Sequence, residues 1–137
     1  MTEQDIEQRG HCLCGETRVV FAGQPKWVAH CHCESCRRQT ASPFTTFLGL
    51  PSDAVRFVGA EPDVYRSSPG VRRLFCRTCG CPTAFISEAF PGEIHLYAAT
   101  LEEPESVAPE CHVHWGEHIR WIQCEDGLPK HERGSAE

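Results

Sequence analysis

The spacing of the cysteines constrains the fold of this chain more than any other feature of the sequence. Three clusters stand out, and two further cysteines are alone. The clusters are Cys12/Cys14, Cys31/Cys33/Cys36 and Cys76/Cys79/Cys81, and the isolated residues are Cys111 and Cys124. Cys-x-Cys and Cys-x-x-Cys spacings let a tight turn aim two sulfurs at one metal ion. We therefore expect metal sites that hold distant parts of the chain together.

An even count of ten cysteines would also allow five disulfides. Residues 1–10 are polar, however, and lack the apolar stretch of a signal peptide. In a reducing compartment clustered thiols more often bind metal or take part in chemistry. We therefore expect metal sites rather than disulfides, and a cytoplasmic protein.

Composition and charge exclude several classes of protein. At 137 residues, with 40% hydrophobic and 23% charged side chains, the chain is expected to form one globular domain. No apolar run reaches the length of a membrane span. The net charge of −6 argues against broad binding to nucleic acid or anionic membranes. We expect a zinc-binding domain over residues 10–132 and disorder over residues 1–9 and 133–137, while no feature indicates the oligomeric state.

Short runs of apolar and β-branched residues between Gly and Pro predict an all-β domain. The expected strands are residues 17–22, 26–29, 44–50, 55–58, 63–66, 71–75, 82–87, 94–99, 112–115 and 120–123. Residues 34–40 are compatible with one or two helical turns. Helical periodicity nowhere extends beyond about two turns, which argues against a helical bundle or a parallel α/β sheet.

Two of the cysteine pairs predict a structural metal site. Cys12/Cys14 and Cys76/Cys79 each adjoin an expected strand, and a glycine follows each pair directly. Glycine supplies the backbone freedom that a tight metal-binding turn needs. Together the two pairs would give a Cys₄ site that fixes the N-terminal strand to the middle of the sheet.

The cluster Cys31/Cys33/Cys36 offers only three thiols to a second metal ion. The fourth position could be filled by Cys81, by a histidine, or by water or an exogenous thiol. The histidine candidates are His30, His32, His112 and His114. A closed site would be structural and an open one reactive, and the spacing is equally compatible with both.

Three motifs resemble those of the glutathione-dependent formaldehyde-activating (GFA) family, which shares its zinc domain with centromere protein V. They are Gly-x-Cys-x-Cys-Gly at 10–15, Cys-His-Cys-x-x-Cys-Arg at 31–37 and Phe-Cys-x-x-Cys-Gly at 75–80. Later features agree, among them Ala99-Thr100-Leu101 and His112 followed by Trp121. The resemblance extends over about residues 10–132.

The resemblance implies a β-tent of antiparallel sheets that carries two zinc ions. By the same resemblance, the structural zinc is held by Cys12, Cys14, Cys76 and Cys79. The second zinc is held by Cys31, Cys33 and Cys36. The implied activity joins a small thiol such as glutathione to formaldehyde or a related aldehyde, and in the reverse direction it is that of a carbon–sulfur lyase. The alternative is a non-catalytic zinc module that carries a small thiol or binds a protein partner.

Further residues have expected roles around the second zinc. Arg37 is a candidate to hold a substrate carboxylate, and His112 is a candidate proton shuttle or a histidine that ties strands together. Arg72 and Arg73 are expected more often on a solvated sheet face than in the site. Two positions depart from the family pattern: Ala41 replaces a usual glycine, and Cys81 stands where a small polar residue is expected.

Overall fold

The computed structural model describes residues 6–134 of the chain. The strands are β1 (Glu7–His11), β2 (Thr17–Ala22), β3 (Trp27–Cys31), β4 (Thr45–Pro51), β5 (Val55–Gly59), β6 (Asp63–Ser68), β7 (Val71–Phe75), β8 (Pro82–Ser87), β9 (Glu93–Tyr97) and β10 (Cys111–Val113). One α-helix, α1 (Glu34–Thr40), follows β3 within this range. Short 3-10 helices lie at Ser52–Ala54, Ala98–Thr100, Pro104–Ser106 and Trp115–Glu117. The predicted all-β class is confirmed.

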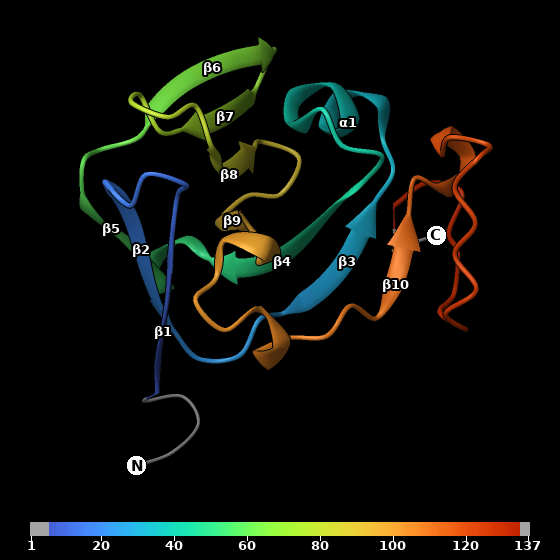
Figure 1. Cartoon of the computed structure of the whole chain (residues 1–137), viewed down its shortest axis with the longest axis horizontal. Helices are drawn as coiled ribbons and strands as arrows, with labels where there is room; N and C mark the ends of the chain where they lie inside the picture. Colours follow the sequence, from blue (N-terminus) through green and yellow to red (C-terminus); the bar gives the residue numbers. More distant parts are fainter. Residues whose placement is uncertain (1–5, 135–137) are drawn as a thin grey trace.

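The strands form two sheets, one of three strands and one of seven (Figure 1). The small sheet has the order β1-β2-β5, and the large sheet has the order β10-β3-β4-β9-β8-β7-β6. All pairings are antiparallel except that of β10 with β3. The last strand of the chain therefore closes the edge of the large sheet beside the first cysteine-bearing strand.

The large sheet buries side chains on both faces, because alternate residues of a strand point to opposite sides. On β4, Leu48 and Leu50 belong to the main core, to which the small sheet contributes Val19 and Phe21. Phe47 points the other way and packs with Cys31, Cys36 and Tyr97 in a second cluster. The second face is the one that carries the candidate site.

The predicted strands are present within two residues of their expected bounds, with one exception. Residues 120 and 121 form a turn, closed by the N–H of Ile122 donating to the carbonyl of Ile119, and residues 122 and 123 have no regular structure. Trp121 is 70% exposed. Without neighbouring strands to bury its apolar residues, that segment has no reason to extend.

Residues 6–9, 133 and 134, which belong to the segments expected to be disordered (1–9 and 133–137), lie within the described range. Residues 7–9 belong to β1, because their backbone pairs with β2 in an antiparallel ladder. Near the other end, the N–H of His114 donates to the carbonyl of Arg133 at 2.7 Å. Residues 1–5 and 135–137 lie outside the described range. Among the described residues, no helix has the length and apolar character needed to cross a bilayer.

Candidate metal centres and pocket

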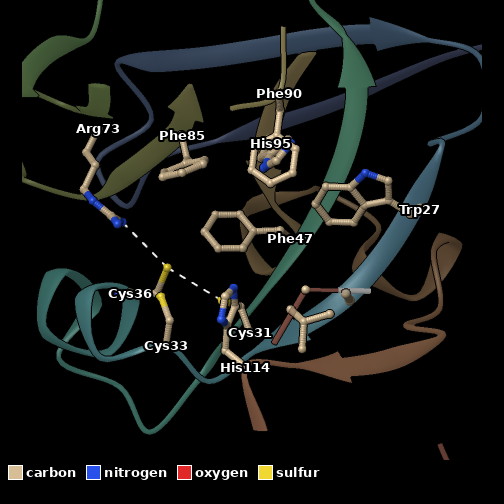
Figure 2. A pocket seen from close by; sticks show the side chains of 13 residues that line it. Trp27, Cys31, Cys33, Cys36, Phe47, Arg73, Phe85, Phe90, His95 and His114 are labelled. Carbon is tan, nitrogen blue, oxygen red and sulfur yellow. Dashed lines mark hydrogen bonds between the residues drawn. The ribbon is translucent and has the colours of Figure 1, made fainter. Parts of the chain in front are cut away.

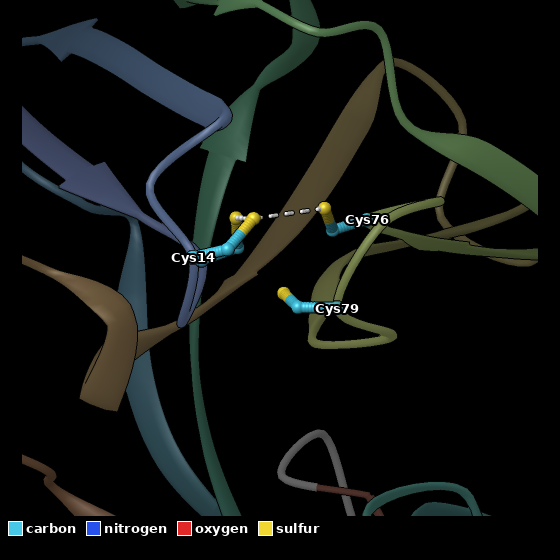
Figure 3. Close-up of side chains that lie close together, drawn as sticks. Cys14, Cys76 and Cys79 are labelled. Atoms are coloured by element: carbon cyan, nitrogen blue, oxygen red, sulfur yellow. Dashed lines mark hydrogen bonds between the residues drawn. The ribbon is translucent and has the colours of Figure 1, made fainter.

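Four cysteines meet between the two sheets and form what we call the four-sulfur cluster: Cys12, Cys14, Cys76 and Cys79. The first two lie in the turn between β1 and β2, and the others lie in the turn between β7 and β8 (Figure 3). The cluster therefore joins the small sheet, which contains the N-terminal strand, to the large one.

The spacing of the sulfurs in this cluster matches a zinc site. Cys12 Sγ and Cys14 Sγ are 3.6 Å apart, and Cys14 Sγ and Cys76 Sγ are 3.7 Å apart. Ligands at about 2.3 Å from a tetrahedral zinc ion lie about 3.8 Å from one another. Backbone N–H groups of Cys79 and Thr78 lower the pKa of Cys76 to about 6, so its thiolate is available at neutral pH. The residues fit zinc in both number and chemistry.

The glycines that follow the two pairs have the backbone geometry expected of them. Gly15 and Gly80 have φ of +82° and +78°, in the left-handed region that disfavours other residues. The turn lets the N–H of Gly80 donate to the carbonyl of Cys76 at 2.8 Å. Each pair of sulfurs is therefore aimed inward by a glycine-terminated turn.

The second cluster, which we call the three-sulfur cluster, consists of Cys31, Cys33 and Cys36. Cys31 ends β3, Cys33 caps α1, and Cys36 lies in its first turn. Cys36 N–H donates to Cys33 Sγ at 3.3 Å, which aims this sulfur at the helix start. The local fold around six consecutive residues thus brings all three sulfurs together.

The geometry of the three-sulfur cluster also fits a zinc ion. Cys31 Sγ and Cys36 Sγ are 3.8 Å apart, and all three sulfurs lie within 4.8 Å of one another. Hydrogen bonds from the other two thiols lower the pKa of Cys33, while the same contacts raise the pKa of Cys31, so the negative charge of the cluster lies first on Cys33. Among residues 6–134, no fourth His, Cys, Asp or Glu completes this cluster. A bound zinc ion would therefore keep one position free for an external ligand.

Cys81 does not reach the three-sulfur cluster. Its thiol donates to the carbonyl of Pro82, and its backbone carbonyl accepts from Cys76 N–H at 2.9 Å. Burial raises the pKa of the Cys81 thiol. Cys81, one of the candidates for the fourth position, thus lies beside the four-sulfur cluster instead.

A cavity of about 220 Å³ opens directly onto the three-sulfur cluster (Figure 2). Besides the three cysteines, its lining residues are Trp27, Ala29, Phe47, Arg73, Phe85, Phe90, His95, Val113, His114 and Gly134. Trp27 can lean over the sheet because Gly49 lies beneath it, where a Cβ atom would come within 2.3 Å of the indole. The walls are therefore mainly aromatic.

Arg73 is the cation of this cavity, although the sequence analysis favoured a solvated position for it. Its side chain is buried, with 5% of the residue exposed, and Nη1 lies 3.7 Å from Cys36 Sγ. Nε donates to Ser67 Oγ, and the guanidinium lies 5.0 Å from the centre of the Phe85 ring. Arg72, its neighbour on β7, is exposed. Because neighbouring residues of a strand point to opposite sides, the sequence could have shown that only one of Arg72 and Arg73 is directed to solvent.

Arg37 and His112 lie near the cysteines without lining the cavity. Arg37 is on α1, and its buried Nε has no hydrogen-bond partner among the described residues. On β10, Val113 faces the cavity. Since neighbouring residues of a strand point to opposite sides, His112 points to the face of the sheet away from the cavity, where it is fully buried. The expected proton shuttle therefore has no contact with the cavity.

His112 is part of a hydrogen-bonded chain behind the three-sulfur cluster. Asp126 Oδ2 lies 2.7 Å from His112 Nε2, and His112 Nδ1 lies 2.9 Å from His32 Nε2. His30 Nδ1 is bonded to Thr46 Oγ1 on the same side. These nitrogen separations are those of hydrogen bonds. Since His32 lies between Cys31 and Cys33, these hydrogen bonds fix the backbone that carries the two cysteine sulfurs.

His114 and His95 are cavity residues that the sequence analysis did not select as catalytic. His114 has φ of +55°, so the chain turns after β10 and this histidine no longer shares a face with His112. His95 is stacked on Phe85 and bonded to Glu93 Oε1 at 3.0 Å. Burial lowers the pKa of His95. The alternation of β9 around Ile94 and Leu96 is the sequence signal that could have placed His95 on the cavity face.

Comparisons with known proteins agree with this architecture. A Schizosaccharomyces pombe protein named as an uncharacterized lyase is 32% identical over 79 residues, or 58% of this chain. The alignment spans 57% of that curated relative's own length. A crystal structure of a Rhodobacter sphaeroides protein has a TM-score of 0.61 and 22% identity, over 89% of this chain and 98% of that one. It shows a shared fold.

The family model described as "Glutathione-dependent formaldehyde-activating enzyme" matches residues 7–117. This range includes both cysteine clusters and all strands from β1 to β10. The motifs noted in the sequence and the two sulfur clusters of the fold are thus parts of one pattern. The chain belongs to the glutathione-dependent formaldehyde-activating enzyme family.

Proposed function

We propose that the protein is a zinc-dependent carbon–sulfur lyase, which joins a small thiol to an aldehyde and, in reverse, cleaves the adduct. The observation that carries the proposal is a cluster of three sulfurs, without a fourth protein ligand among the described residues, at one side of a cavity. Family membership and the lyase-named relative support it. We further propose two zinc ions per chain, glutathione or a similar thiol as partner, and a cytoplasmic location suited to free cysteines.

The reaction needs a thiolate and a polarised carbonyl group. Zinc bound at the three-sulfur cluster would favour the thiolate form of an incoming thiol, whose pKa is otherwise near 8.5. The thiolate sulfur donates an electron pair to the carbonyl carbon and forms the C–S bond. The π electrons of the carbonyl group move to its oxygen, which takes up a proton. The reverse reaction breaks the C–S bond and returns thiol and aldehyde.

Arg73 is positioned to assist this charge movement. Three thiolates and a divalent zinc ion carry a net charge of −1, which the guanidinium near Cys36 Sγ offsets. The desolvation of Arg73 opposes its charge, but the neighbouring Cys36 outweighs that effect and raises its pKa. A permanently charged donor beside the reacting atoms can stabilise the developing oxyanion.

His114 is the proposed proton donor to that oxygen. It lines the same cavity as the three thiols, and its Nδ1 lies 3.6 Å from Glu117 Oε2. Its side chain is 38% exposed, so a proton lost to the substrate can be replaced from solvent. Aromatic walls keep water away from the carbonyl carbon, where it would compete with the thiol.

Zinc analysis and spectroscopy with and without glutathione test the proposal. We expect two zinc ions per chain and, after cobalt substitution, a glutathione-dependent change in the spectrum of one of them. Cys33→Ser should abolish this change and the catalysed formation of adduct, whereas Cys111→Ser, away from both clusters, should preserve them. A spectrum that ignores glutathione would contradict the open site. A changed spectrum without rate enhancement would indicate a thiol carrier instead of an enzyme.

A further inference from the structure

The walls of the cavity are mainly aromatic, whereas a peptide would require polar walls and a one-carbon substrate a smaller space. Four aromatic side chains, Trp27, Phe47, Phe85 and Phe90, contribute to the lining. A volume of about 220 Å³ corresponds to roughly seven water molecules at about 30 Å³ each. A one-carbon aldehyde would leave most of this apolar space unfilled, and thus forgo contacts that stabilise a bound substrate.

Aromatic groups surround the space in orientations that suit another ring. His95 is stacked on Phe85 with centroids 5.5 Å apart, and Trp27 meets His95 edge-on at 4.6 Å. Phe47 packs at 5.9 Å from Phe85. Aromatic rings prefer such offset and edge-to-face neighbours at 4.5–7 Å. The cavity is therefore shaped by ring packing.

Few of the side chains that line the cavity are polar. Apart from the thiols, the polar side-chain groups among the described lining residues are those of Arg73, His95 and His114 and the indole N–H of Trp27. A peptide amide buried against phenylalanine rings would lose its hydrogen bonds to water, at a cost of about 1–3 kcal/mol. The peptide arms of a thiol such as glutathione therefore belong outside the cavity, which leaves the apolar space to the aldehyde.

The polar and apolar groups also divide the cavity along one direction. Figure 2 shows Arg73 and the cysteines on one side, and Phe90, His95 and Trp27 on the other. Phe90 is 45% exposed and lies at the opening. A substrate with a reactive carbonyl at one end and an apolar group at the other would satisfy both sides.

We propose that the carbonyl substrate is an aldehyde that bears an aromatic ring, rather than formaldehyde. This inference rests on the proposed thiol–aldehyde reaction. The ring packs against the cavity-lining side chains of Trp27, Phe47 and Phe85, with the carbonyl group toward the thiols. The electron movements are those given above: the thiolate forms the C–S bond, the carbonyl π pair moves to oxygen near Arg73, and a proton completes the adduct.

Rates with two aldehydes and one thiol test the substrate class. Zinc-loaded protein is assayed with benzaldehyde and with formaldehyde, each with 2-mercaptoethanol, by exchange NMR. Each catalysed rate is divided by its spontaneous rate, because formaldehyde is intrinsically more reactive. We expect an enhancement at least tenfold larger for benzaldehyde. An equal or larger enhancement for formaldehyde overturns the inference, whereas no enhancement with either aldehyde overturns the lyase function itself.

Binding supplies a readout that does not depend on turnover. Benzyl alcohol has the ring but no carbonyl, and it should shift the indole N–H resonance of Trp27 in the zinc-loaded protein. The indoles of Trp115 and Trp121, which do not line the cavity, should not move. A ligand that leaves the Trp27 signal in place overturns the aromatic class, whatever the assay shows.

Exposed aromatic residues allow a variant with little risk to folding. Phe90→Ser should lower the ratio of benzaldehyde to formaldehyde enhancement by about threefold or more. Tyr65→Ser is the matched control, because Tyr65 is 60% exposed and lies outside the cavity. It should leave the ratio unchanged. A ratio that is the same in both variants and in the wild type overturns the role given to the ring.

Discussion

The four-sulfur and three-sulfur clusters are both built on tight turns, but they differ in how many ligands they offer to a metal ion. In the first, two turns from separate sheets each supply a pair of sulfurs, and the site is complete. In the second, one short segment supplies three sulfurs, and the neighbouring strand β7 supplies Arg73. Cys76 of the first cluster follows Arg73 by only three positions. The segment from Arg73 on β7 to Cys76 just after it thus supplies a ligand to one cluster and a cation to the other.

The difference lies in what compensates the charge. Four thiolates and zinc carry a net charge of −2, and backbone N–H groups of Thr17 and Thr78 donate to sulfurs of the four-sulfur cluster. Three thiolates and zinc carry −1, which the guanidinium of Arg73 offsets, together with one backbone N–H, that of Cys36. A substitution of a side chain leaves these backbone N–H donors in place, whereas a substitution of Arg73 removes its guanidinium. The reactive cluster therefore depends more on single residues.

Exchanging one sulfur in each cluster should have the largest effect and should separate fold from function. Cys76→Ser should remove one zinc ion and unfold the chain. Structural zinc contributes about 10–16 kcal/mol, as much as the whole stability of a typical domain. Cys33→Ser should remove the other zinc ion and leave the circular dichroism spectrum of a folded β protein. Metal analysis and circular dichroism check both. An unfolded Cys33→Ser protein would show that the clusters are alike.

Removing the cation tests whether charge compensation distinguishes the clusters. Arg73→Gln should weaken zinc binding at the three-sulfur cluster and lower the free energy of unfolding by about 1–3 kcal/mol, the range for hydrogen bonds to charged groups. Arg72→Gln is the control on the same strand, with an expected change within about 0.5 kcal/mol. Urea unfolding and competition with a chelator measure the two quantities. Equal effects of both exchanges would reject the role of Arg73.

Backbone geometry offers a smaller test of the same comparison. The turns of the four-sulfur cluster end in glycine, but the C-terminus of α1 in the three-sulfur cluster is capped by Ala41, with φ of +54°. This conformation costs a non-glycine residue about 1–2 kcal/mol, less the entropy that glycine loses on folding. Ala41→Gly should therefore raise the free energy of unfolding by about 0.5–1 kcal/mol.

The reverse exchange is the control for that stabilisation. Gly80→Ala should lower stability by a similar amount or more, because its φ of +78° also disfavours alanine. Thermal unfolding of the zinc-loaded proteins measures both. A destabilised Ala41→Gly protein would mean that the methyl group of Ala41 contributes more than its backbone strain costs.

The smallest expected effect concerns pH, and it arises from a histidine in the cavity beside the three-sulfur cluster. Burial lowers the pKa of His95 from 6.5, so the unfolded chain takes up a proton at a higher pH than the folded one. The free energy of unfolding should therefore fall as pH decreases below about 6.5. In His95→Gln this part of the slope should be absent. Urea unfolding of the wild type and of His95→Gln between pH 7.5 and 5.5 measures the slope of the free energy of unfolding against pH. Identical slopes for the two proteins would contradict the role of His95.

Much of the fold could be read from the sequence, because Gly and Pro bound most strands. The strand β1 could not, since Glu7–His11 is polar on both faces and is held by its ladder with β2. In the site, the cysteines were predictable from spacing. Arg73 was not, because its contact with Cys36 joins residues 37 positions apart. Local patterns identify ligands, whereas the tertiary fold decides which other groups meet them.

The parallel pairing of β10 with β3 has a consequence for biosynthesis. His32 and His112, which meet across this pairing, are 80 residues apart. The three thiols are complete once Cys36 has emerged from the ribosome, but the wall formed by Val113 and His114 follows only later. At about 5–20 residues per second, the interval is about 4–16 s. A nascent chain therefore presents a metal-binding trithiol before its cavity exists, so zinc can be loaded before the wall formed by Val113 and His114 is in place.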